Sequence, residues 1–250
     1  MRIKKFTTIK TISIIASIFL FPLQKEGVGV RLKLKKMKKT ILSLLLICFG
    51  LTLFAQSDKY VPAMKKNIAM LDSAMQRKDM TILANNFERI GDAEKTQWLP
   101  YYYAAYCNIM NAFFETDKTK TDAIADKAEA LITKAESILG KENSETDVIK
   151  SMIASSHMMV DPQSRYMKYG GTSSENIKNA ELLDPTNPRP VYLEAQSKFY
   201  TPAAFGGGKD VAKPLFEKAL AMFDTFKPVG ELDPTWGKSA TLYFLSLTSK

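Results

Sequence analysis

The chain has 250 residues, of which 46% are hydrophobic and 24% charged, with 12 glycines and 11 prolines. This composition is typical of a globular protein and excludes collagen-like, low-complexity and disulfide-framework proteins. The formal net charge of +9 belongs to the N-terminal part, because residues 1–55 hold 11 of the 35 Lys and Arg residues but only one of the 26 acids, Glu26. The 24 bases and 25 acids that remain leave residues 56–250 near neutrality, which removes the electrostatic argument for nucleic-acid binding.

Two apolar runs lie in the N-terminal part, at 12–21 and 41–54. Each is shorter than the ~20 residues that a helix needs to cross a bilayer, so neither predicts a stable transmembrane span. The second run has the parts of a secretory signal, with a basic start at 37–39 and a small residue, Ala55, before Gln56. We predict cleavage between Ala55 and Gln56 and export to the periplasm or cell envelope, or secretion. The alternative is a membrane-anchored hairpin of both runs.

The signal divides the chain into three parts. We predict that residues 37–55 form the signal peptide. Because a start at Met37 already gives a complete signal, we interpret residues 1–36 as an upstream extension, which is either upstream sequence read in frame or an unusually extended n-region. Residues 56–250 form the mature domain of 195 residues. This domain holds a single cysteine, Cys107, which excludes an intramolecular disulfide after cleavage.

Apolar residues recur at helical spacing through the mature domain, and no stretch alternates as a strand rich in β-branched residues would. The clearest stripe ends at Gly140, and Gly91 stands at the end of an earlier one, so we expect both glycines to terminate helices. Ser144 is the expected N-cap of another helix. We therefore predict an all-α fold. The predicted helices span 59–76, 80–90, 98–114, 121–139, 144–160, 174–183, 190–200, 211–226 and 236–249.

An internal repeat is visible among these helices. The pattern Ala-x3-Phe-x2-Ala spans 212–219, recurs with Ile in place of Phe at 128–135, and is partly present at 177–185. It resembles the second helix of a tetratricopeptide (TPR) repeat, in which small residues let two helices approach closely, and we expect these residues to be buried. The segment 201–220 is similar to a loop and helix of exported bacterial TPR-like proteins, and periplasmic TPR subunits of TRAP-type transporters carry a related loop. The resemblance implies a TPR-like α-solenoid of about four helix pairs, closed by a capping helix at 236–249.

No constellation of catalytic residues is recognisable. His157 is the only histidine, and no nucleophile motif accompanies it, so we expect a border or surface histidine rather than a catalytic one. One histidine and one cysteine cannot supply a typical zinc site, so no metal or cofactor is predicted. The run Gly206–Lys209 lacks the preceding strand of a phosphate-binding loop. We expect Asp122 and Asp126 on solvent-exposed faces, and we predict that the protein is not an enzyme.

The TPR resemblance implies that the first helix of each pair lines a concave surface. On the 98–114 helix, Tyr101, Asn108 and Asn111 share one side, while most other aromatic residues there are expected in the core. The other candidate ligand-binding residues are Ser151, Glu194 and Lys198. We predict a scaffold or binding protein that acts on a protein, peptide or small polar ligand. The alternative is a periplasmic accessory subunit of a transporter that handles a small-molecule substrate.

Overall fold

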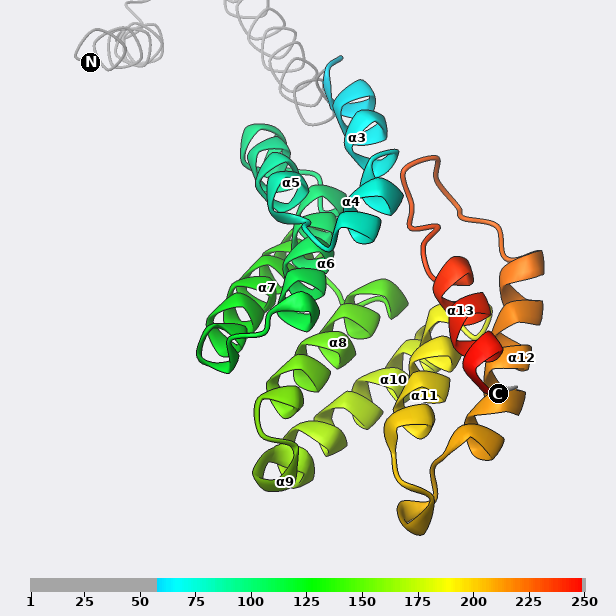
Figure 1. Ribbon diagram of the computed structural model, residues 1–250. Coiled ribbons are helices and arrows are strands. Elements are labelled where there is room, and N and C mark those ends of the chain that lie inside the picture. Colours follow the sequence, from blue (N-terminus) through cyan, green and yellow to red (C-terminus); the bar gives the residue numbers. More distant parts are fainter. Residues whose placement is uncertain (1–57, 249–250) are drawn as a thin grey trace, which may run out of the picture. The chain divides into compact units, whose positions relative to one another are not determined.

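The computed structural model describes residues 58–248, which form helices and connecting turns without a β-strand (Figure 1). The all-α fold predicted from the sequence is therefore confirmed for this part of the chain. The upstream extension, the signal peptide and its cleavage site lie outside the described residues. Within the described part, no helix combines the length and the apolar character that crossing a membrane requires.

Each long helix begins within three residues of its predicted start. The long helices are α5 (Thr81–Glu94), α6 (Leu99–Phe114), α7 (Lys118–Leu139), α8 (Ser144–Val160), α10 (Gly171–Leu183), α11 (Pro188–Tyr200), α12 (Lys209–Thr225) and α13 (Lys238–Thr248). The short elements are α3 (Tyr60–Ile68), α4 (Leu71–Arg77), α9 (Pro162–Arg165), the π-helical turn η2 (Tyr166–Gly170) and the 3-10 turn η3 (Ala203–Phe205). The predicted 59–76 helix is thus two helices, and nothing in the sequence at Ala69–Met70 explains the break.

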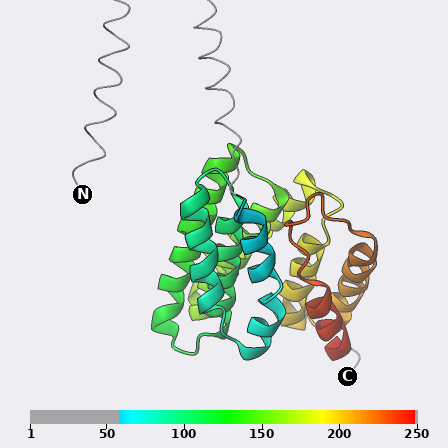
Figure 2. The ribbon, with the colours of Figure 1, turned by 90° about the horizontal axis from the view of Figure 1, so that it is seen from above.

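Each long helix packs against the next long helix along the chain, from α5 on α6 to α12 on α13. Helix α6 also contacts α8, and α8 contacts α11, so these three helices share one layer. Figure 2 shows the cyan and green helices together on one side and the yellow and orange helices on the other. Stacking of successive pairs is what a helical-repeat protein requires, while the assignment of these pairs to the TPR repeat stays a prediction.

The core contains the repeat-pattern residues, as predicted. The two alanines and Phe216 of the 212–219 pattern are fully buried, and so are the alanines and Ile132 of the 128–135 pattern. The Phe216 ring stacks on Phe244 of α13, with ring centroids 5.5 Å apart. Small residues at these positions let neighbouring helices approach, and the large ring fills the space between α12 and the last helix.

Two helix ends differ from their predictions. Gly91 does not end its helix, because α5 continues to Glu94. A Cβ at Gly91 would lie 2.7 Å from the Tyr101 ring, so glycine is needed here for the close packing of α5 on α6. Ser144 does not cap α8, because Asn143 does so, and the Ser144 hydroxyl donates to the Ala180 carbonyl at 2.8 Å. Gly140 does end α7, in the left-handed conformation (φ 70°) that glycine adopts at low cost.

Candidate functional site

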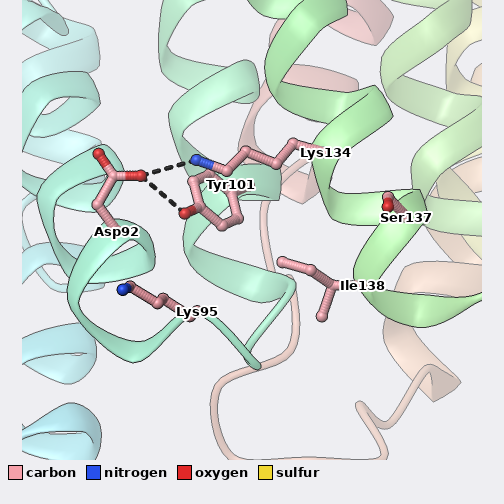
Figure 3. A pocket seen from close by; sticks show the side chains of 6 residues that line it. All are labelled: Asp92, Lys95, Tyr101, Lys134, Ser137 and Ile138. Atoms are coloured by element: carbon pink, nitrogen blue, oxygen red, sulfur yellow. Dashed lines mark hydrogen bonds and ion pairs between the residues drawn. The ribbon is translucent and has the colours of Figure 1, made fainter. Parts of the chain in front are cut away.

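Tyr101 lies between three helices rather than on an open face. Its ring is buried, its hydroxyl donates to Asp92 of α5 at 2.8 Å, and the Lys134 ammonium of α7 lies 4.1 Å from the ring centroid (Figure 3). Lys134 also pairs with Asp92 at 2.7 Å, and its hydrogen bond, followed by that of Tyr101, lowers the pKa of Asp92. These groups border a shallow pocket of about 370 Å³ that Lys95, Ser137 and Ile138 complete. The polar groups of Asp92, Tyr101 and Lys134 bond one another and so join α5, α6 and α7.

Three further candidate residues also make internal bonds. Asn108 is buried and donates to the Ala104 carbonyl, and the buried Ser151 hydroxyl is 2.8 Å from that of Ser173 on α10. The side-chain oxygen of Asn111 accepts from the backbone N–H of Met80 at 2.8 Å, just before α5 begins. The expectation that Tyr101, Asn108 and Ser151 lie on an open surface is therefore corrected by their burial.

Glu194 and Lys198 lie on α11 and are partly exposed. Their four-residue separation places them on one side of the helix, as the sequence predicts. Their contact with a ligand stays a prediction.

A segment of the chain itself packs against α6 and the start of α11. We name residues 226–237, which connect α12 to α13 and are drawn in orange and red in Figure 1, the strap. Tyr103 of α6 donates from its hydroxyl to the Leu232 carbonyl at 2.9 Å. Trp236 stacks on Tyr106 with ring centroids 4.7 Å apart. The strap therefore contacts α6, one of the helices expected to line the concave surface.

A buried charge pair holds the strap in place. Arg189 of α11 is fully buried, pairs with Glu145 of α8 at 2.8 Å, and donates to the Pro234 carbonyl of the strap. Its guanidinium also lies 5.1 Å from the ring centroid of Trp236. Burial raises the pKa of the Glu145 carboxyl, while Arg189 and the hydroxyl of Tyr102 act in the opposite direction. Buried charges persist only when they are paired and hydrogen-bonded, as these are.

A second cluster surrounds the only histidine. His157 is buried, its Nδ1 is 2.8 Å from an oxygen of Asp122, and the Tyr169 ring stacks on the imidazole with centroids 5.0 Å apart. Arg165 donates from both Nη atoms to the two Asp122 oxygens, at 2.7 and 2.9 Å. These hydrogen bonds, that of Arg165 foremost, lower the pKa of Asp122 to about 2. His157 is therefore not a border residue, and Asp122 is not a plain surface charge, because the pair joins α7 to α8.

The π-helical turn η2 covers this histidine. Tyr169 faces inward onto the imidazole, while Tyr166 is 56% exposed and Met167 is 85% exposed. A Cβ at Gly170 would lie 3.2 Å from the Tyr166 ring, so glycine lets this ring lie close to the backbone. Single π-helical turns are rare and occur frequently at functional sites. The helical periodicity predicts only a connection here, and the signal that marks the segment is the run of four consecutive large side chains from Tyr166 to Tyr169.

Comparison with known proteins gives a single finding. No protein-family model and no curated protein matches the chain. The HusA haemophore from Porphyromonas gingivalis, a solved structure, matches with a TM-score of 0.69 and 37% identity, over 78% of this chain and 95% of that one. The chain belongs to the HusA haemophore family. Nearly the whole length of the HusA haemophore therefore has its counterpart here.

Proposed function

We propose that residues 56–250 form an exported haem-binding protein that is not an enzyme. The observation that carries the proposal is the 37% identity to a haemophore over 95% of its length. The match covers 78% of this chain, which is enough to contain the whole domain expected after Ala55. The buried Ala-x3-Phe-x2-Ala patterns support a TPR-like arrangement of the helix pairs.

Haem sets three requirements for a surface that binds it. Its flat faces need exposed apolar or aromatic side chains, its propionates need a cation, and its iron accepts an axial ligand such as His, Cys, Met or Tyr. The described residues hold one histidine and one cysteine, His157 and Cys107, and both are buried. An exposed Tyr or Met is therefore the available kind of iron ligand in this part of the chain.

The turn η2 meets these requirements within four consecutive residues. Tyr166 and Met167 offer exposed apolar surface together with an oxygen and a sulfur atom. Lys168 is exposed, and its ammonium lies 4.6 Å from the ring centroid of Tyr169. We place the haem-binding surface at Tyr166, Met167 and Lys168, and call it the η2 surface. The proposal concerns haem and does not extend to a peptide partner.

Titration of the purified protein with hemin tests both parts of the proposal. We expect a new Soret band and saturation near one hemin per chain. The double variant Tyr166→Ala/Met167→Ala should lose at least about tenfold in affinity, because two well-placed side chains each contribute about 1 kcal/mol or more. The matched control is Leu182→Ala/Val229→Ala, which removes two exposed apolar side chains elsewhere.

The possible outcomes test the proposed haem binding separately from the proposed location of the site. Failure of the unaltered protein to bind hemin at micromolar concentration contradicts the proposed function. Equal affinities of the double variant and the unaltered protein leave the function standing and move the site away from the η2 surface. Loss of affinity in the control pair alone places the site near one of its two residues.

A further inference from the structure

We propose that His157, Asp126 and Glu129 form a binding site for a divalent transition-metal ion such as Zn²⁺, separate from the iron of haem. One ligand atom from each of these residues lies within 4.8 Å of the other two. Asp126 and Glu129 are three residues apart on α7 and so share one side of that helix. His157 comes from the adjacent helix α8. The site would therefore bridge two helices.

The orientation of the imidazole supports metal binding. The Nδ1 atom of His157 lies 2.8 Å from an oxygen of Asp122, which accepts a proton but does not donate one when it is ionised. Arg165 holds both oxygens of Asp122, which fixes the carboxylate in the ionised form. The proton of a neutral imidazole is then on Nδ1, and the lone pair is on Nε2. A carboxylate that accepts from the far nitrogen of a metal-binding histidine is the common outer-shell arrangement of zinc sites.

The Nε2 atom of His157 faces the two other carboxylates. It lies 3.5 Å from an oxygen of Asp126, which is long for a hydrogen bond. In the neutral imidazole both of these atoms are acceptors, and a cation between them would bind both. The side chain of His157 is 8% exposed, so packing fixes the position of its ring. The Nε2 atom is thereby held toward the two carboxylates that would complete the ligand set.

The alternative to a metal ion is a second proton on the ring. An imidazolium would donate to both Asp122 and Asp126 and would need no further ligand. The two interpretations differ in the state of Nε2, which carries a metal ion in one and a proton in the other.

The donor set favours a transition metal over Ca²⁺ or Mg²⁺. One imidazole nitrogen and two carboxylates suit Zn²⁺, whereas the hard cations prefer oxygen ligands alone. Asp126 and Glu129 are exposed, so an ion can reach the site from solvent, and water can complete a tetrahedral shell. The Tyr169 ring covers one face of the imidazole and leaves the edge with Nε2 to the carboxylates.

Nitrogen-15 NMR of the imidazole observes this site directly, because His157 is the only histidine of the sequence. A protein prepared without a histidine tag therefore gives one set of ring signals. One equivalent of Zn²⁺ should shift the resonance of Nε2. Calorimetry with Zn²⁺ should give one site per chain. Ring resonances that Zn²⁺ leaves unchanged would overturn the proposal.

Two surface variants test the carboxylates without disturbing the core. Asp126→Asn and Glu129→Gln should each weaken Zn²⁺ binding by about tenfold or more, because each removes a charged ligand. Glu217→Gln on α12 is the matched control, since it removes an equally exposed carboxylate far along the chain. Equal weakening by the control, or none by the two site variants, contradicts the proposed ligands. Hemin binding should persist after chelation of Zn²⁺, because the two sites are separate.

Discussion

The indole nitrogen of Trp236 donates to the hydroxyl of Tyr102 at 2.8 Å, across 134 residues of sequence. The same Tyr102 hydroxyl donates to Glu145, which pairs with Arg189. The strap is therefore attached to α6, α8 and α11 by one continuous hydrogen-bonded chain. Each partner lies on a different element, so the network sets the position of the strap only when all of these helices have packed.

Removal of the Trp236 side chain tests this attachment. We expect Trp236→Ala to lower the free energy of unfolding by about 3–5 kcal/mol, because it deletes the stack on Tyr106 as well as the hydrogen bond. Trp236→Phe retains an aromatic ring and should cost less, about 1–2 kcal/mol. Urea unfolding followed by circular dichroism measures both. The control Val229→Ala changes a fully exposed residue of the same strap and should leave the free energy of unfolding unchanged. If Trp236→Ala is as stable as this control, the strap is not held by its tryptophan.

The charge pair beneath the strap gives a prediction with a pH dependence. Arg189→Met leaves the Glu145 carboxylate buried without its cation, which should cost about 3–5 kcal/mol. The double variant Arg189→Met/Glu145→Gln should recover part of this loss. Burial raises the pKa of Glu145, so in Arg189→Met the folded state holds the Glu145 proton more tightly than the unfolded state does.

The stability of Arg189→Met relative to the unaltered protein should therefore improve as the pH falls from neutrality toward the ordinary carboxyl range. The double variant, which has no titrating group at 145, should lack this dependence. Unfolding at several pH values measures the difference. Parallel pH profiles of the single and double variants would contradict the assignment of the cost to an unpaired Glu145.

Gly91 and Gly171 form a matched pair for a packing prediction. Both glycines lie in helices, where alanine is favoured by up to about 1 kcal/mol. A Cβ at Gly171 would meet nothing within 4 Å, so Gly171→Ala should leave the protein equally or more stable. A Cβ at Gly91 would lie 2.7 Å from the Tyr101 ring, and Gly91→Ala should cost about 1–3 kcal/mol despite the better helix propensity. Thermal unfolding compares the two, and a stabilised Gly91→Ala would contradict the close packing of α5 on α6.

These residues also show how far the sequence determines the structure. Helices such as 144–160 were predicted at their observed bounds because apolar periodicity is a local signal. The predicted roles of Gly91 and Ser144 at helix ends were wrong because each residue contacts a partner on another helix. Gly91 packs against the Tyr101 ring, and Ser144 donates to the Ala180 carbonyl. A pattern within one helix contains no information about such partners.

The candidate site was harder to predict for the same reason. The sequence places Tyr101 and Asn108 on one side of a helix but does not say that neighbouring helices cover that side. Arg189 lies between two prolines at the start of α11, a position typical of an exposed turn, and its burial depends on partners 44 and 45 residues away. The stacking of Tyr169 on His157 likewise depends on a π-helical turn, which helical periodicity does not predict.

Cys107 gives a prediction about chemical reactivity. The thiol is fully buried in α6, and burial raises its pKa well above the ordinary range. Because the thiolate is the reactive form, the folded protein should react with a disulfide reagent near neutral pH much more slowly than the unfolded protein does. A colorimetric thiol assay with and without denaturant measures this. Ser174→Cys adds a thiol at an exposed position and should react at once, and rapid reaction of the unaltered protein would contradict the burial.

The last prediction concerns the iron. If haem binds at the η2 surface through a side-chain ligand, hemin should bind more tightly than metal-free protoporphyrin IX, because the free porphyrin has the same ring and propionates but no iron. Tyr166→Phe keeps the ring and removes the phenol oxygen, and Met167→Leu keeps the bulk and removes the sulfur. One of these two variants should abolish the difference between the two porphyrins while it leaves the affinity for protoporphyrin unchanged. Fluorescence quenching and absorption titrations measure the affinity of each of the three proteins for both porphyrins. Equal affinities of the unaltered protein for both would show that the surface holds the porphyrin ring without ligating its iron.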